Sequence, residues 1–214
     1  MAAKLPNPPP VKTLKAILPV TRTFKAGTEF ARIFFAGGAH GTRWDDFRFF
    51  GPTGSRFDHH QLKSGKAAIQ NRGIMYLATG KQSIPTCLAE VFQSTRIIDR
   101  HHRQPTLVIF KLAKSLTLLN LSGAFCTKIG ASTAIHSGPS PKAQRWSAQL
   151  YAAYPKIDGL LYCSSMYGNA PAIALYERAL RAMPARPIFH RSLNDPALNH
   201  VILATGTHIN YGVV

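Results

Sequence analysis

Apolar residues occur in short runs along the chain, and turn-forming residues separate these runs. The run from Thr28 to Ala36 is apolar, aromatic and compatible with a β-strand, and two glycines end it. Comparable short runs predict further strands over residues 73–78, 107–110, 116–121 and 160–164. A last strand is expected near the C-terminus, over residues 201–203.

Three segments have a helical pattern. The first begins at Ser83, which can cap a helix with Pro85 in its first turn, and it continues to Arg96. The second covers residues 142–154 and the third residues 170–183, and a proline follows each of them. Strands and helices interleave at irregular intervals. This order favours an α+β fold over a doubly wound parallel sheet.

Two parts of the chain have little regular pattern. Residues 39–70 are rich in Gly, Asp, His and Arg, and an irregular excursion of this length is typical of a functional or mobile loop. Four prolines in the first ten residues break any helix there, so residues 1–24 are predicted to form a flexible or surface-draped arm. With no internal repeat and no membrane-spanning run, we expect one domain with a C-terminal extension over residues 25–214.

The composition is that of a globular protein with an unusual charge. Of the 214 residues 45% are hydrophobic, which allows a sizeable core, and 26 Lys and Arg outnumber 9 Asp and Glu for a net charge of +17. Such an excess indicates an anionic partner: nucleic acid, a phosphorylated small molecule or an acidic protein surface. The basic residues are scattered rather than packed into one run, so a basic surface without a specific ligand remains an alternative.

The cysteines and histidines do not form a metal-binding pattern. Cys87, Cys126 and Cys163 lie far apart and form no CxxC pair, which indicates reduced, mostly buried thiols and a cytoplasmic protein. Two histidine doublets, at residues 59–60 and 101–102, are interpreted as solvated loop histidines. We assign no metal.

Familiar catalytic motifs are absent: the sequence contains no GxGxxG, Walker loop, HExxH or GxSxG. Candidate residues must therefore be argued singly. Glu90 lies among apolar residues in CLAEVF, where it is either a functional carboxylate or a glutamate on the surface of a helix. Arg32 lies in an apolar strand, so either that strand is exposed or the guanidinium pairs with a carboxylate or an anion. Arg56, after a Gly-rich turn, is an anion ligand or a loop cation.

Two further polar positions have alternative interpretations. Ser164 and Ser165 follow an apolar strand, where polar groups of α/β sites gather, but they equally fit a turn that ends a strand. No His–Asp pairing is visible that would activate either serine as a nucleophile. Glu177, next to Arg178, is interpreted as a surface salt-bridge partner.

The order of five segments resembles the RES-domain family, named for an arginine, a glutamate and a serine. The segments are FARI, GSRFD, GIMYLA, CLAEVFQ and DGLLYCSS, and the similarity runs from about residue 28 to residue 193. The resemblance implies a compact fold similar to ADP-ribosyltransferases, with a mainly antiparallel sheet flanked by helices. It also implies NAD as a substrate rather than a bound cofactor, inorganic phosphate as a co-substrate, and an Xre-like antitoxin as partner.

The resemblance assigns a role to five residues of this chain. Glu90 matches the family glutamate and would stabilise positive charge on the ribose while the nicotinamide–ribose bond breaks. Arg56 and Arg32 match the family arginines and would hold the pyrophosphate, and Arg56, counted with Glu90 as catalytic, or Arg32 would hold an attacking phosphate in line. Tyr76 would stack on nicotinamide or its ribose, unless it simply packs in the core, and Ser164 would hold nicotinamide or a ribose hydroxyl. The implied function is that of an NAD phosphorylase or glycohydrolase that acts as the toxin of a toxin–antitoxin pair.

Two other functions fit the same sequence. The first is an ADP-ribosyltransferase that modifies a macromolecule recruited by the basic surface. The second is a nucleic-acid-binding module without catalysis, which the Arg-Phe pairs at residues 48–49 and 56–57 favour slightly.

Overall fold

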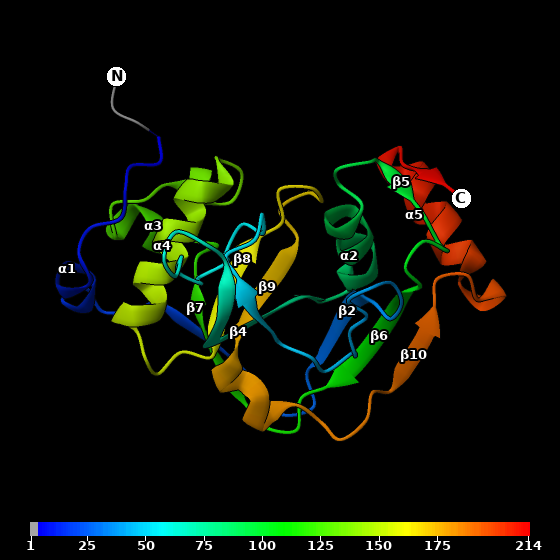
Figure 1. Cartoon of the computed structure of the whole chain (residues 1–214), viewed down its shortest axis with the longest axis horizontal. Coiled ribbons are helices and arrows are strands. Elements are labelled where there is room, and N and C mark those ends of the chain that lie inside the picture. Colours follow the sequence, from blue (N-terminus) through cyan, green and yellow to red (C-terminus); the bar gives the residue numbers. More distant parts are fainter. Residues whose placement is uncertain (1–3) are drawn as a thin grey trace.

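The computed structural model describes residues 4–214, which form one twisted sheet with helices on both of its halves (Figure 1). Within these residues the sheet has nine strands in the order β1-β7-β8-β9-β4-β2-β6-β10, and β3 pairs with β4 off this path. The pairs are antiparallel except β7 with β8. The strands are β1 (Thr21–Phe24), β2 (Glu29–Phe35), β3 (Arg48–Gly51), β4 (Ala68–Thr79), β6 (Pro105–Lys111), β7 (Leu116–Asn120), β8 (Gly159–Cys163), β9 (Pro171–Tyr176) and β10 (Phe189–Ser192).

The helices divide between the two halves. The helices α1 (Val11–Lys15), α3 (Phe125–Lys128) and α4 (Ser140–Ala153) lie beside the half that contains β7 and β8, whereas α2 (Ser83–Val91) and α5 (Asn199–Ile209) lie beside β2 and β6 (Figure 1). A small parallel pair, β5 (Ile97–Ile98) with β11 (Gly212–Val213), lies next to α5. Short 3-10 turns cover Thr133–Ile135, Glu177–Ala182 and Pro196–Leu198. The expected α+β fold with a mainly antiparallel sheet is confirmed.

The two halves of the sheet separate where β2 meets β4. These strands pair only at Phe30 with Thr79 and at Ala31 with Ala78. Beyond that point β2 continues along β6 and β4 continues along β9. The split exposes the facing edges of β2 and β4 to a shared space, and this space holds the candidate site.

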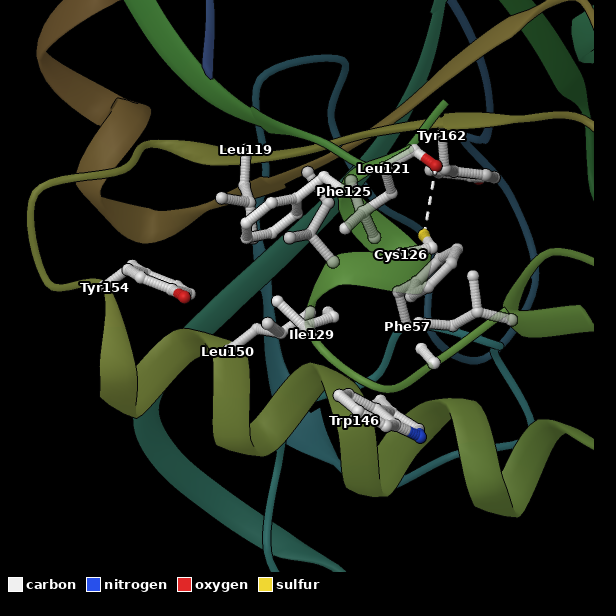
Figure 2. Packing of buried hydrophobic residues seen from close by; sticks show 14 of the residues in the cluster. Phe57, Leu119, Leu121, Phe125, Cys126, Ile129, Trp146, Leu150, Tyr154 and Tyr162 are labelled. Atoms are coloured by element: carbon white, nitrogen blue, oxygen red, sulfur yellow. Dashed lines mark hydrogen bonds between the residues drawn. The ribbon is translucent and has the colours of Figure 1, made fainter. Parts of the chain in front are cut away.

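A large apolar cluster supports the half that contains α4. Trp146 and Leu150 of α4 belong to one apolar cluster with Leu119 of β7 and Phe125 of α3, which Figure 2 shows from close by, and all four side chains are buried. The cluster includes Phe57, whose ring lies 4.5 Å from that of Tyr162. Phe57 directly follows Arg56, so this core anchors the loop that carries a candidate site residue.

The N-terminal arm is packed on the domain from residue 4 onward. Leu5 and Leu14 are buried in the same apolar cluster. The indole of Trp146 donates to the carbonyl of Pro6 at 2.9 Å, and the Tyr154 hydroxyl donates to the carbonyl of Leu14 at 2.8 Å. The arm is therefore draped on α4, and β1 at its end pairs with β7. Residues 1–3 of the predicted arm lie outside the described residues.

The predicted helix over residues 170–183 is wrong. Residues 171–176 form β9, which is hydrogen-bonded to β4 on one side and to β8 on the other, and residues 177–182 form a 3-10 helix. Five of the six β9 residues are buried. Alanine and leucine favour a helix, but pairing in the centre of a sheet overrides this propensity.

Three other predictions near chain turns need correction. The strand expected over residues 201–203 is part of α5, whose buried face includes Ile202. The helix expected to reach Arg96 ends at Val91, and Ser83 is its first residue rather than its cap. Residues 39–70 are irregular as expected, apart from β3 and the start of β4. Within residues 4–214, no helix is long and apolar enough to cross a membrane.

Candidate active site

A cavity of about 870 Å³, called the main cavity below, opens in the split between β2 and β4. Residues 32–35 of β2 and 74–78 of β4 line two of its sides, and α2 contributes Glu90. Four arginines line it but, among the described residues, only one carboxylate, that of Glu90. A cavity with this balance favours a ligand that carries several negative charges. The four arginines are Arg32, Arg48, Arg56 and Arg103.

Glu90 is held in the cavity by Ser164. The Ser164 hydroxyl donates to Glu90 Oε1 at 2.5 Å and accepts from the backbone amides of Met166 and Tyr167 at 3.2 and 3.0 Å. Its hydrogen-bonding capacity is thus filled, and the side chain is buried. Glu90 Oε2 has no hydrogen-bond partner within residues 4–214, so it remains available to a ligand. Ser165, in contrast, is exposed and itself lines the cavity.

Arg32 lies in the position expected for it, but its partners differ from those predicted. Its Nη1 donates to the backbone carbonyls of Trp44 at 2.7 Å and Asp46 at 3.0 Å. Burial lowers the pKa of Arg32 to about 10, an effect that the nearby Asp46 and Asp45 oppose. The guanidinium therefore stays charged at neutral pH. Because carbonyl oxygens leave much of its charge uncompensated, Arg32 can still attract an anion in the cavity.

Arg56 belongs to a loop, residues 51–56, that the protein fixes from several sides. Its Nη1 donates to the carbonyl of Gly138. The side chain of Gln144 donates to the carbonyls of Thr53 and Ser55 at 2.6 and 2.9 Å. This loop, which lies in the stretch predicted to be irregular, therefore has a defined shape, and it directs Arg56 to the cavity.

A buried carboxylate, Asp58, ties this loop to Arg48. Asp58 Oδ2 accepts from the amide and hydroxyl of Thr53 at 2.7 and 3.0 Å and lies 2.9 Å from Arg48 Nη2. Its Oδ1 lies 2.5 Å from His60 Nδ1. Burial alone would raise the pKa of Asp58, but the hydrogen bonds from His60 and Thr53 and the charge of Arg48 lower it well below its usual range. Gly51 permits this packing, since a Cβ there would lie 2.6 Å from His60 Cγ.

Two uncharged rings complete the wall next to Arg56. Tyr76 lines the cavity, and its hydroxyl accepts from the amide of Phe57 at 3.2 Å. His136 also lines the cavity, and its Nε2 lies 3.0 Å from the carbonyl of Leu121. Burial lowers the pKa of His136, and the nearby Arg56 lowers it further. Tyr76 thus combines an aromatic surface toward a ligand with a hydrogen bond to the site loop.

The interpretation of His59 and His60 as solvated histidines is wrong, because both are buried. His60 bonds to Asp58, and the His59 ring stacks on that of Tyr151 at 4.4 Å. Burial lowers the pKa of His59. The doublet at residues 101–102 is exposed, as expected. The three cysteines are free, and Cys87 and Cys126 are buried.

Glu177 lies 3.9 Å from Arg178 Nε, as expected for a salt-bridge partner, but both side chains are partly buried rather than on the surface. It accepts from the Tyr151 hydroxyl at 2.6 Å and from the amide of Gly73 at 2.9 Å. Burial alone would raise the pKa of Glu177, but these hydrogen bonds and His59 lower it to about 2. Glu177 and these partners do not line the main cavity.

The structure brings together the five residues proposed from the sequence. Arg32, Arg56, Tyr76 and Glu90 line one cavity, and Ser164 contacts it through Glu90. Sequence reasoning missed Arg48, Arg103, His136 and Asp58. The first two belong to the scattered basic residues, which no motif distinguishes. No motif identifies Asp58, because its partners Thr53, His60 and Arg48 lie on both sides of it in the sequence and only folding brings them together.

Comparison with known proteins gives two findings. The family model described as RES domain matches residues 29–194. The crystal structure of the M. tuberculosis MbcT–MbcA toxin–antitoxin complex contains a chain similar in fold, with a TM-score of 0.55 and 16% sequence identity. That alignment covers 91% of this chain and 96% of the other. No curated protein matches this chain.

Proposed function

The chain belongs to the RES-domain family, and from this premise we propose that it consumes NAD by cleaving the bond between nicotinamide and ribose. The observation that carries this proposal is the main cavity itself. One carboxylate with a free oxygen shares the cavity with four arginines. A dinucleotide requires the same combination, because it has a central anionic pyrophosphate and neutral ribose hydroxyls.

The arginines would bind the pyrophosphate. A guanidinium donates two parallel hydrogen bonds to phosphate oxygens, and Arg32 and Arg56 approach the cavity from β2 and from the loop that ends at residue 56. Because each is fixed by backbone carbonyls, little side-chain freedom is lost when a ligand binds. Tyr76 would provide a surface on which nicotinamide or its ribose stacks.

Glu90 would act on the ribose. When the C1–N bond breaks, its electron pair leaves with nicotinamide, which becomes neutral, and the ribose acquires oxocarbenium character. A carboxylate fixed beside this ribose stabilises the developing positive charge and can accept from a hydroxyl through its free oxygen. Ser164 holds Glu90 in place and is a positioning residue in this scheme. An acceptor oxygen then bonds to C1.

The acceptor decides which enzyme of this class the protein is. Phosphate gives ADP-ribose 1-phosphate, water gives ADP-ribose, and a macromolecular nucleophile gives an ADP-ribosylated product. The test incubates purified protein with NAD, with and without inorganic phosphate, and identifies the products by mass spectrometry. We expect release of nicotinamide from NAD, at a rate reduced at least about 100-fold in Glu90→Gln. Intact NAD under all conditions, or an unchanged rate in Glu90→Gln, would refute the proposal.

The biological role proposed here is that of a cytoplasmic toxin neutralised by an antitoxin of the Xre-like type. Family membership and the neighbour in fold, a member of a toxin–antitoxin complex, support this role. The net charge of +17 would favour an acidic partner surface. Expression of the chain alone should arrest growth, and Glu90→Gln should abolish the arrest. Co-expression of a small neighbouring open reading frame should restore growth; growth arrest that persists in Glu90→Gln would contradict this role.

A further inference from the structure

A second, smaller cavity adjoins the main cavity. Its volume is about 400 Å³, and five residues line it: Gly38, Ala39, His40, His102 and Arg103. His40 and Arg103 also line the main cavity, so the two spaces are contiguous. The side chains that line the smaller cavity include three with N–H donors and no carboxylate. We call it the side cavity.

The walls of the side cavity are joined by backbone hydrogen bonds. One wall follows the end of β2 and the other precedes β6, two strands that pair as far as Phe35 with Pro105. Beyond that pair, the amide of Ala36 donates to the carbonyl of Gln104 at 3.1 Å, and that of Gly37 donates to the carbonyl of Arg103 at 3.0 Å. The cavity is therefore an extension of a strand pair rather than a gap between free loops.

Arg103 is held in an unusual backbone conformation. Its φ is +60°, and that of Gln104 is +52°, in the left-handed region that residues with a Cβ rarely adopt. A hydrogen bond of 3.0 Å from the Gln104 amide to the His101 carbonyl closes this turn. Gly38, with φ +87°, lies against it, and a Cβ there would come within 3.3 Å of Arg103 Cγ. Such conformations persist where the surrounding structure imposes them, often at binding sites.

The guanidinium of Arg103 differs from the other arginines of the main cavity. Arg32, Arg48 and Arg56 all donate to backbone carbonyls. The Arg103 guanidinium instead stacks 4.7 Å above the ring of Phe35 and has no protein acceptor within residues 4–214. Stacking orients its plane, and all of its N–H donors remain available to a ligand.

We propose that Arg103, His40 and His102 form a subsite for a phosphate group beside the main cavity. The planar guanidinium would donate two hydrogen bonds to phosphate oxygens. Each histidine ring has at least one N–H donor whether it is neutral or protonated. A phosphate group is small enough to enter the side cavity. Its negative charge suits a cavity whose three polar side chains are all N–H donors and which no carboxylate lines.

The identity of that phosphate group rests on the proposed function and has two sources. It is inorganic phosphate acting as the acceptor, or it is a phosphate of the dinucleotide. In the first case an anionic phosphate oxygen bonds to ribose C1 while the electron pair of the C1–N bond leaves with nicotinamide. Because the attacking oxygen is already deprotonated, this step requires no general base.

The test compares Arg103→Ala with a matched control, Arg22→Ala. Arg22 is also exposed and also stacks on a phenylalanine, at 5.1 Å from Phe24, but it lines neither cavity. Both variants lose one positive charge, and alanine retains the Cβ at each position. Calorimetric titrations with inorganic phosphate and with ADP-ribose measure binding without any turnover.

We expect Arg103→Ala to weaken the binding of one of these two probes about tenfold and Arg22→Ala to leave both unchanged. Weaker binding of inorganic phosphate identifies the acceptor as its source. Weaker binding of ADP-ribose alone identifies a phosphate of the dinucleotide. Equal affinities of the two variants for both probes would overturn the subsite. If the protein consumes no NAD, the proposed function fails, but the phosphate titration still decides whether the subsite exists.

Discussion

The contact between Ser164 and Glu90 makes a quantitative prediction for Ser164→Ala. The serine hydroxyl donates to Glu90 Oε1 at 2.5 Å and accepts from two backbone amides. Its side chain is 1% exposed, so water cannot readily replace it. Removal of the hydroxyl therefore leaves a carboxylate and two amides without their partner.

Each of these losses has its own magnitude. A hydrogen bond to a charged group is worth about 1.5–3 kcal/mol, so we expect kcat/KM for NAD to fall about 10- to 100-fold when Glu90 is no longer fixed. The two amides lose an acceptor, which should lower the free energy of unfolding by about 1–3 kcal/mol. The variant should therefore remain folded at room temperature, where activity can be measured.

The assay is the initial rate of nicotinamide release together with urea unfolding of the same preparations. Ser64→Ala is the control, because Ser64 is exposed, lines neither cavity and makes no hydrogen bond to Glu90. A double-mutant cycle with Glu90→Gln separates positioning from a general loss of stability. If Ser164 acts through Glu90, its mutation should have little further effect on the rate in the Glu90→Gln background.

Two results would refute this reasoning. One is a Ser164→Ala variant that is less stable but has the wild-type kcat/KM, because the hydrogen bond would then be structural only. The other is a full additional loss of rate when Ser164→Ala is combined with Glu90→Gln. That outcome would give the serine a direct contact with the substrate.

Two further predictions concern the buried carboxylate Asp58 and the half-buried carboxylate Glu177. Asp58→Asn leaves Arg48 without its charged partner, so it should lower the free energy of unfolding in urea by roughly 3–5 kcal/mol. Glu29→Gln, which removes one partner of an exposed ion pair with Lys111, should cost less than about 1 kcal/mol, and equal effects of the two variants would contradict this. The pKa of Glu177 is lowered to about 2 from an ordinary 4.5, so its stabilising contribution is present above pH 4.5 and is lost as the pH falls toward 2. Between pH 6 and pH 3, wild-type protein should lose roughly 2 kcal/mol more of its unfolding free energy than Glu177→Gln, and identical pH dependence would rule this out.

Most of the fold could be predicted from local pattern. Strands with apolar runs, such as residues 107–110 and 116–121, were placed correctly because their side chains are buried on both faces. The segment over residues 171–182 was not, because its alanines and leucines have helical propensity, and only pairing with β4 and β8 decides its conformation. Such errors are expected for central strands, because helical propensity is a local property whereas a central strand is stabilised by partners distant in sequence.

The candidate site could be predicted only where a motif marks it. The five residues taken from the family resemblance converge on one cavity or its wall, although the sequence separates Arg32 from Ser164 by most of the domain. No sequence motif distinguishes Arg103. Its distinguishing features are structural: a left-handed backbone conformation and a guanidinium that has no protein acceptor within residues 4–214. Asp58 likewise could not be predicted from the sequence, because its role depends on its burial in the folded protein and not on a spacing pattern.

The chain has nine carboxylates, and the surroundings of Glu90 differ from those of the other eight. The other eight each accept from a backbone amide or lie within ion-pair distance of a cationic side chain. Within residues 4–214, Glu90 bonds through its carboxylate only to the neutral hydroxyl of Ser164, although four arginines line the same cavity. Because the Glu90 carboxylate forms no ion pair within the fold, removal of its charge should cost little free energy of unfolding. Glu90→Gln, which keeps an acceptor for Ser164, should therefore change the free energy of unfolding in urea by less than about 1 kcal/mol while it lowers the rate of NAD consumption at least about 100-fold. A large loss of stability in this variant would mean that Glu90 serves the fold, and its assignment to the ribose would then lose its physical basis.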